Sequence, residues 1–206
     1  MKFSAYVLIV LLALGAGYAG SQLGVKSANT PVAHESVYDR VMKSGVIRCG
    51  YGQWPPLLVK DANTGKITGM AADILEEMAR NLKLKVEWAE ETGWGSFAEA
   101  LSANRIDMFC NALWQNAERS RVVYFTRPFA YSASHAYGRV DDARFDEDLS
   151  LLNDAQYKIA VMGGEMSSTI ARNFFPKANT LSLSQMSSGA ELVLAVQDGK
   201  ADITFL

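Results

Sequence analysis

Two short stretches, Asn104-Arg-Ile-Asp107 and Gly199-Lys-Ala-Asp202, repeat one pattern in the two halves of the chain. Each stretch begins, just after a predicted helix, with an Asn or a Gly. A basic residue, an apolar residue and an aspartate complete it, and an apolar strand comes next. Strands that alternate with helices are typical of α/β proteins, whose parallel strands need a crossover connection. The repeat therefore predicts two similar α/β lobes.

The first round of elements lies between residues 46 and 121. Ala72 to Leu82 carries apolar side chains at helical spacing, so a helix with one buried face is expected. Ser96-Phe-Ala-Glu99 matches a capping box at the start of a second helix, and Asn116 is placed to cap a short third one. Trp54-Pro55-Pro56 must be a loop, because proline cannot continue a strand ladder. Strands are predicted over 46–50, 84–88 and 106–110.

The second round follows an extended crossing segment and a charge-rich stretch, Asp141 to Asp148, that we expect to be exposed. Strands are predicted over 159–162, 180–183 and 201–206, with helices over 167–175 and 187–198. These boundaries divide the chain into lobe 1, residues 36–135, and lobe 2, residues 136–206. A two-lobed α/β protein places its ligand in the cleft between the lobes, at the carboxyl ends of strands.

The first 26 residues do not belong to this fold. Lys2 precedes 23 residues without a charge, and the most apolar part lies between Ala5 and Leu14. A basic start and an apolar run of this kind predict a secretory signal peptide, for which Gly17-Tyr18-Ala19 offers a cleavage site. The uncharged run is also long enough for an N-terminal membrane anchor, and the two alternatives stay open. Residues 27–35 are predicted to be a linker, and the protein is expected to be exported.

Composition and motifs exclude several classes of function. The chain has 206 residues, of which 49% are hydrophobic and 20% charged, and this composition excludes intrinsic disorder. A formal net charge of −2 lacks the basic surplus of a nucleic-acid-binding protein. No phosphate-binding loop, dinucleotide fingerprint or nucleophile elbow is present, and His34 and His135 have no partners for a catalytic or metal site. We therefore predict neither a cofactor nor a metal, and no catalytic residue.

Aromatic and basic residues mark the predicted cleft. Trp54, Trp94 and Trp114 all lie where the chain leaves a strand or enters a helix, the positions at which loops line ligand sites in α/β folds. Arg119 follows an apolar strand at a predicted helix start, where a guanidinium can take a carboxylate through two parallel hydrogen bonds. Cys49 and Cys110 are the only cysteines; from their spacing, a disulfide and two buried thiols are both open.

An ordered set of motifs resembles one known family. It is similar to the family 3 extracellular solute-binding proteins, the amino-acid-binding subunits of ABC importers, which have the type II periplasmic binding protein fold. The resemblance covers about Ser36 to Leu206. Its motifs are Ser44-Gly-Val-Ile-Arg-Cys-Gly50, Trp54-Pro-Pro56, Asn63-Thr-Gly-Lys-Ile-Thr-Gly69, Ala117-Glu-Arg119 and Gly199-Lys-Ala-Asp202.

The resemblance implies a role for each of several positions. Arg119 matches the arginine that pairs with the ligand α-carboxylate, and Trp54 and Trp94 match the aromatics that sandwich its side chain. Asn111 and Ala112 match the segment that receives the α-amine. In lobe 2, the turn and helix start, whose free backbone N–H groups face the ligand carboxylate, correspond to Met162, Glu165, Met166 and Ser167.

Four positions depart from the family pattern. Trp114 stands where a small polar residue is usual, Asn116 replaces a threonine, and Glu165-Met166 replaces a pair of small hydroxyl residues. Trp114 would narrow the pocket or add another aromatic wall, and Glu165 would repel a carboxylate if it points inward. A cationic, amine-bearing or aromatic ligand is therefore a reasonable hypothesis beside a generic amino acid.

The resemblance also places the strands that carry Cys49 and Cys110 side by side, which favours a disulfide in an exported protein. It implies a C-terminally truncated chain, in which lobe 2 is incomplete and the acid that pairs with the ligand ammonium lies just past Leu206.

The function that follows is the substrate-binding component of an ABC importer, periplasmic or on the outer face of the inner membrane. It would capture a small solute and present it to a membrane permease without chemical turnover. The alternatives are a ligand-sensing receptor domain and a periplasmic dehydratase-like enzyme on the same fold, for which Glu165 is the only unusual acid or base.

Overall fold

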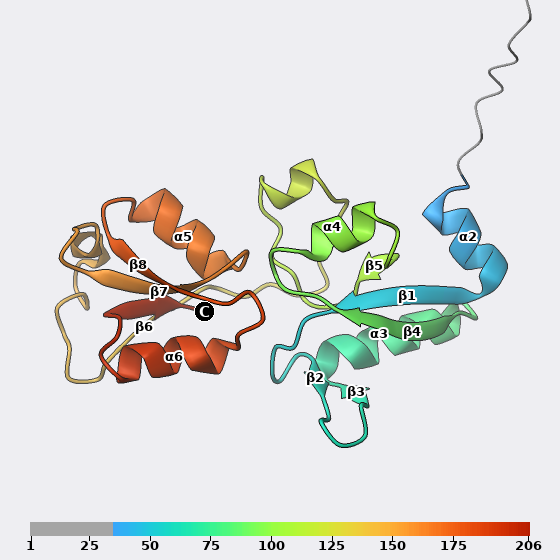
Figure 1. Ribbon diagram of the computed structural model, residues 1–206, viewed down its shortest axis with the longest axis horizontal. Helices are drawn as coiled ribbons and strands as arrows, with labels where there is room; N and C mark the ends of the chain where they lie inside the picture. Colours follow the sequence, from blue (N-terminus) through green and yellow to red (C-terminus); the bar gives the residue numbers. More distant parts are fainter. Residues whose placement is uncertain (1–34) are drawn as a thin grey trace, which may run out of the picture. The chain divides into compact units, whose positions relative to one another are not determined.

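The computed structural model describes residues 35–206 (Figure 1). The predicted signal peptide or anchor and nearly all of the predicted linker lie outside these residues. Among residues 35–206, no helix combines the length and the apolar character that crossing a membrane requires. The boundary between residues 135 and 136 stays a prediction; lobe 1 and lobe 2 below denote the chain before and after it.

Lobe 1 is built around a parallel sheet with strand order β4-β1-β5. A separate antiparallel pair, β2 and β3, lies on either side of the turn at 61–65 and precedes helix α3. Leu75 and Ala79 are buried on the inner face of α3, as the spacing predicted. The elements are α2 (Val37–Ser44), β1 (Val46–Tyr51), β2 (Val59–Lys60), β3 (Ile67–Thr68), α3 (Met70–Asn81), β4 (Lys85–Glu91), α4 (Phe97–Ser102), β5 (Met108–Phe109) and the 3-10 turn η1 (Arg119–Arg121).

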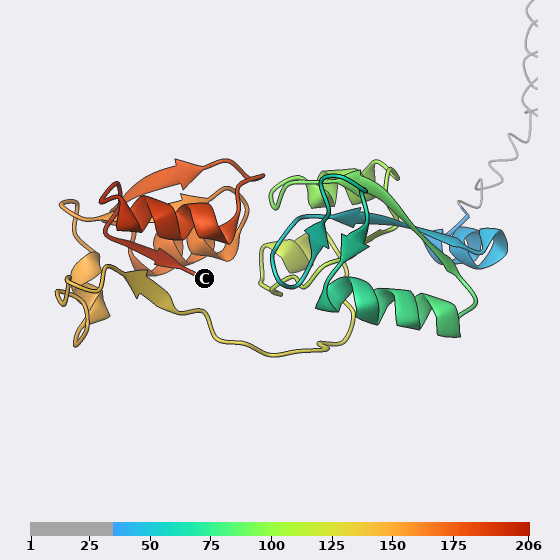
Figure 2. The same ribbon diagram turned by 90° about the horizontal axis from the view of Figure 1, so that it is seen from below.

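Lobe 2 contains a sheet with strand order β6-β9-β7-β8, in which only β6 runs antiparallel to its neighbour. Helices α5 and α6 lie on opposite faces of this sheet, in both views (Figures 1 and 2). The elements are β6 (Ala136–Gly138), the 3-10 turn η2 (Leu149–Leu152), β7 (Lys158–Met162), α5 (Met166–Phe174), β8 (Asn179–Leu183), α6 (Gly189–Gln197) and β9 (Ile203–Phe205).

The repeated tetrapeptide makes the same structure twice. Asn104 and Gly199 both adopt positive φ, 55° and 71°, and so turn the chain out of α4 and α6. Asp107 then accepts the backbone N–H of Arg48 and donates its own N–H to the Arg48 carbonyl, each at 2.8 Å. Asp202 makes the same two bonds with Lys158, at 2.8 and 2.7 Å. The aspartate thus ties each helix–strand unit to the neighbouring strand.

Cys49 of β1 and Cys110, just after β5, form a disulfide with Cα atoms 5.4 Å apart. Both are buried, with Leu75 of α3 against them. The pairing that the resemblance implied is therefore present, and it joins the two strands from which lobe 1 sends its loops towards the candidate site.

Helix capping differs from the prediction. Ser96 does not cap α4 through its side chain, because its backbone is already helical and its Oγ donates to the Gly93 carbonyl at 3.3 Å. The capping box is found instead at α6, where Ser188 and Glu191 bond each other's backbone N–H groups. The charge-rich stretch is mostly exposed as expected, but Phe145 within it is buried against Tyr157.

Asp142 is expected to make the stability of lobe 2 depend on pH in the acid range. Hydrogen bonds from Arg144, aided by the charge of Arg139, hold its pKa at about 2, below the ordinary 3.8. A carboxylate with a lowered folded-state pKa contributes stability that is complete above its unfolded pKa and is lost as pH falls through the folded value.

We therefore expect wild type to be more stable than Asp142→Asn above about pH 5, and the difference to shrink towards pH 2. Urea unfolding at a series of pH values measures this difference. A gap of constant size from pH 6 to pH 2 would contradict the assignment.

Candidate functional site

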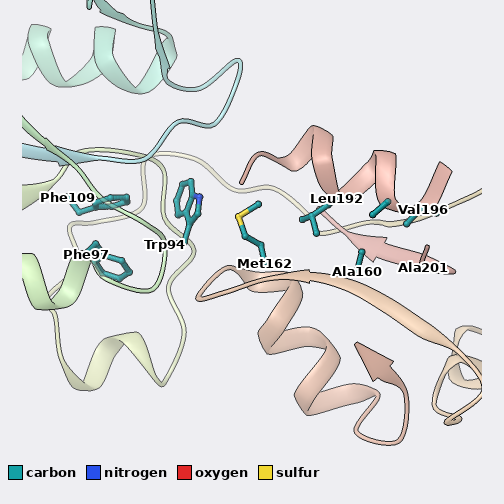
Figure 3. Packing of buried hydrophobic residues seen from close by; sticks show 9 residues of the cluster. Trp94, Phe97, Phe109, Ala160, Met162, Leu192, Val196 and Ala201 are labelled. Atoms are coloured by element: carbon teal, nitrogen blue, oxygen red, sulfur yellow. The ribbon is translucent and has the colours of Figure 1, made fainter. Parts of the chain in front are cut away.

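The candidate site lies where loops of lobe 1 contact lobe 2. One buried apolar cluster contains residues of both lobes, with Trp94, Phe97 and Phe109 from lobe 1 and Met162 and Leu192 among those from lobe 2. In Figure 3, Trp94 lies between the two phenylalanines and Met162. Apolar burial at this junction holds the predicted site residues in place.

The two predicted sandwich residues, Trp54 and Trp94, are brought together. Their rings meet edge to face, with centroids 5.4 Å apart and planes at 83°. Trp94 is 6% exposed and also packs against Phe109, whereas Trp54 is half-buried and faces Gly189 at the start of α6. In this structure the rings therefore form a corner of aromatic surface and not a pair of parallel walls.

Arg119 is buried at the junction, with 8% of the residue exposed. Asn116 Oδ1 accepts its backbone N–H at 2.8 Å, but in place of the predicted helix there is a 3-10 turn, Arg119–Arg121, whose N-cap residue is Glu118. The guanidinium donates to the carbonyls of Trp114 and Gly164, at 2.8 and 2.6 Å, and lies over the Phe97 ring. Burial lowers the pKa of Arg119, while the charge of Glu165 opposes that shift. Arg119 thus links the two lobes and contributes a buried positive charge.

The start of α5 differs from the expectation of free N–H groups. Glu165, itself 6% exposed, is the N-cap, and its Oε2 accepts both the backbone N–H and the Oγ–H of Ser167 at 2.7 Å. The Ser167 Oγ in turn accepts the N–H of Met162 at 3.1 Å. The Ser167 N–H is therefore not free for a ligand carboxylate, because the protein's own carboxylate occupies that position.

The remaining predicted residues occupy three different environments. Asn111 is buried, donates to the Gly52 carbonyl at 2.6 Å and accepts the N–H of the half-buried Ala112 at 2.7 Å. Trp114 is 38% exposed, and its carbonyl accepts a hydrogen bond from the Arg119 guanidinium at 2.8 Å. Met166 places its sulfur 3.6 Å from the Asn116 amide nitrogen.

Two residues at the junction were not found from the sequence. Gln185, between β8 and α6, accepts the Trp94 N–H with its carbonyl at 3.3 Å and the Gly95 N–H with its side chain at 3.1 Å. Thr92, next to this loop, is buried, and its hydroxyl has no hydrogen-bond partner among residues 35–206. Neither residue belongs to a motif, so only the folded chain shows their position.

Two other features lie apart from the junction residues. A cavity of about 310 Å³ in lobe 2 lies between α5 and strands β7 and β8, and none of the predicted site residues lines it. In the described part of the chain, no group of three or more His, Cys, Asp or Glu side chains is arranged to hold a metal ion.

Comparison with known proteins points to one family of proteins. A model of the bacterial extracellular solute-binding proteins, family 3, matches residues 47–199. A probable amino-acid ABC transporter-binding protein of Haemophilus influenzae is 34% identical over 97 residues, 47% of this chain and 37% of that protein. The cyclohexadienyl dehydratase of Pseudomonas aeruginosa is 25% identical over 173 residues, 83% of this chain and 62% of the enzyme.

The fold has counterparts among solved structures. The crystal structure of the ancestral amino acid-binding protein AncCDT-1, a precursor of cyclohexadienyl dehydratase, matches with a TM-score of 0.74 and 29% identity. The match covers 83% of this chain and 74% of the ancestral protein. The predicted α/β periplasmic-binding-protein fold is thereby confirmed.

The chain spans only 37% and 62% of the lengths of the two curated relatives described above. One of these relatives is a binding protein and the other is an enzyme. Membership of the family therefore does not decide between binding and catalysis, and the chemistry of the site has to be considered. The family model covers well over half of the chain. The chain belongs to the bacterial extracellular solute-binding proteins, family 3.

Proposed function

We propose that the protein is the substrate-binding component of an ABC importer and captures a small amino-acid-like or amine-bearing solute where its two lobes meet. The observation that carries this proposal is the buried Arg119 guanidinium beside the Trp54–Trp94 corner, at a junction formed by both lobes. An aromatic surface next to a buried charge offers an amino acid both an apolar contact and an ion pair.

Binding in this proposal is coupled to the approach of the lobes. Arg119 would exchange a carbonyl partner for the ligand carboxylate, and Trp54 and Trp94 would contact the ligand side chain, with Asn111 and Ala112 near its amine. The contacts of Arg119 with Gly164 and of Gln185 with Gly95 already join the lobes and support a closed form. A hinge motion between open and closed lobes lets ligand enter.

The partners and location follow from the same proposal. A closed, ligand-loaded protein would be recognised by the membrane permease of the importer, outside the cytoplasm. The similarity to an amino-acid ABC transporter-binding protein supports this assignment. We propose export by the N-terminal segment, either as a cleaved signal or as a retained anchor, and no catalytic activity.

A dehydratase is the second candidate, because one relative is a cyclohexadienyl dehydratase and Glu165 is a buried carboxyl group at the junction. An enzyme of this kind needs a general acid or base within reach of the substrate. In the structure, Glu165 instead accepts two hydrogen bonds as the cap of α5, which favours binding over catalysis.

A thermal-shift screen against amino acids, amines and carboxylates, followed by mass spectrometry of each hit, tests the proposal. A binding protein is stabilised in a concentration-dependent manner and returns the ligand unchanged. Conversion of a hit into product would support the dehydratase, and a screen in which no solute raises the Tm would overturn the binding role.

Arg119→Ala is expected to weaken binding of a carboxylate ligand by roughly 10- to 150-fold, because a hydrogen bond to a charged group contributes about 1.5–3 kcal/mol. Titration calorimetry with a hit of the screen measures the loss. Arg121→Ala is the matched control, since Arg121 lies on the same 3-10 turn but is exposed. Equal affinity of the Arg119 variant and wild type would remove Arg119 from the site.

A further inference from the structure

We propose that the cavity in lobe 2 is a second binding site, for a small carboxylate with an apolar body, and that Arg172 binds the carboxylate group. The cavity has a volume of about 310 Å³, which is the size of the smaller ligand sites of proteins. It lies between α5 and strands β7 and β8, away from the junction residues. The proposal therefore goes beyond the proposed function and does not depend on it.

Short side chains on the edge strand leave room beneath α5. Val161 pairs with Ser182 in the parallel ladder of β7 and β8, and Ile159 pairs with Thr180, so these four side chains lie on one face of the sheet. On β7 that face carries two buried aliphatic side chains, which belong to the core beneath α5. On β8 it carries two small polar residues that are exposed. Because β8 is the edge strand, solutes reach the cavity from this side.

The lining combines an apolar floor with hydroxyl groups. Val161, Ala171 and Phe175 are buried and supply the floor, while Thr180 and Ser182 supply hydroxyl groups at the open side. Apolar surface with a small number of polar groups is typical of sites for small molecules. The apolar body of a ligand would displace water from the floor, which is favourable.

Arg172 gives the cavity a positive charge. It follows Ser168 by four residues, on the face of α5 that lines the cavity, and it is the only charged residue among the described residues of the lining. Its Nη2 donates to both carboxylate oxygens of Glu118, at 2.6 and 2.7 Å, and its other nitrogens form no hydrogen bond within residues 35–206. The side chain is 56% exposed, so a solute can reach those nitrogens. A guanidinium has five N–H donors, and the remaining ones suit a second carboxylate.

Phenylacetate and its uncharged analogue phenylacetamide test the proposal in NMR titrations of the full chain. We expect phenylacetate to shift the backbone amide signals of Ser168, Ala171 and Thr180. It should bind about fivefold more tightly than phenylacetamide, which is the upper end of what an exposed ion pair contributes. Acetate lacks the apolar body and should bind more weakly than phenylacetate. Equal binding of acetate and phenylacetate would reduce the effect to charge attraction and overturn the proposal.

Arg172→Gln is expected to abolish the preference, so that phenylacetate and phenylacetamide bind with equal affinity. This substitution also removes the contact with Glu118 of lobe 1, so Glu118→Gln is the matched variant: it removes the same ion pair but keeps the guanidinium. Glu118→Gln should bind phenylacetate at least as tightly as wild type. Loss of the preference in both variants would make the ion pair between the lobes responsible and would overturn the proposal.

Arg119→Ala distinguishes the cavity from the junction. Arg119 does not line the cavity, so this variant should bind phenylacetate as wild type does. If none of the three probes shifts the lining amides, or if binding is lost in Arg119→Ala but kept in Arg172→Gln, the proposal is wrong and the proposed function stands. Binding in the cavity without any ligand at the junction would leave the proposal standing and overturn the proposed function alone.

Discussion

Replacement of both Cys49 and Cys110 by alanine is expected to lower the free energy of unfolding by about 4 kcal/mol. The disulfide joins residues 61 positions apart, and a cross-link over a loop of this size removes a large amount of conformational entropy from the unfolded chain. In a domain of this size, the loss corresponds to a fall in Tm of roughly 8–16 °C.

Differential scanning calorimetry of oxidised wild type, reduced wild type and the double variant measures the effect. The reduced protein is the matched control, because it keeps both sulfur atoms in the core with Leu75 and lacks only the bond. Reduced wild type and the double variant should unfold within a few degrees of each other. A reduced protein as stable as the oxidised one would show that the cross-link contributes little.

The fold was largely predictable, because the repeated tetrapeptide at 104–107 and 199–202 reflects requirements of main-chain geometry. Asn104 and Gly199 tolerate the positive φ that ends a helix, and Asp107 and Asp202 each pair with a neighbouring strand through the same two bonds. These requirements are local, so they leave a pattern in the sequence. The same holds for the helical spacing of α3.

Capping was less predictable than periodicity. Ser96 and Ser188 both precede a glutamate by three residues, yet only Ser188 caps its helix. The hydroxyl of Ser96 donates to the Gly93 carbonyl and does not cap α4, and no local sequence pattern predicts that hydrogen bond.

The sequence predicted which residues lie together at the junction of the lobes, but not the contacts that they make there. The resemblance selected Trp54, Trp94 and Arg119, and the structure places all three at the junction of the lobes. It could not indicate that Glu165 folds back onto Ser167, since that depends on a side-chain rotamer. Gln185 was missed because its role depends on contact between residues 90 positions apart.

Gly164→Ala is expected to keep the lobes from reaching the contact seen in the structure. A Cβ at residue 164 would meet backbone atoms of Gly95 and would lie 2.7 Å from the carbonyl carbon of Trp94. Backbone atoms cannot rotate away as a flexible side chain can, so the lobes must separate. Overpacking of this kind costs about 1–3 kcal/mol, which would weaken binding of a ligand held by the closed form by roughly 5- to 150-fold.

Gly199→Ala separates this effect from backbone strain. Gly164 and Gly199 have similar positive φ values, 76° and 71°, so an alanine at either position has a similar conformational cost of about 1–2 kcal/mol. A Cβ at Gly199 meets nothing within 4 Å. Both variants should therefore lose similar stability as folded chains, while only Gly164→Ala should lose the contact between the lobes.

Amide hydrogen exchange measures that contact without a ligand. In the structure, Gln185 accepts the N–H groups of Trp94 and Gly95, so these two amides are protected only while the lobes are together. We expect both to exchange faster in Gly164→Ala and at the wild-type rate in Gly199→Ala. Unchanged protection in Gly164→Ala would mean that residues 95 and 164 need not approach closely for the lobes to meet, and the contacts of Gln185 and Arg119 would then account for the junction.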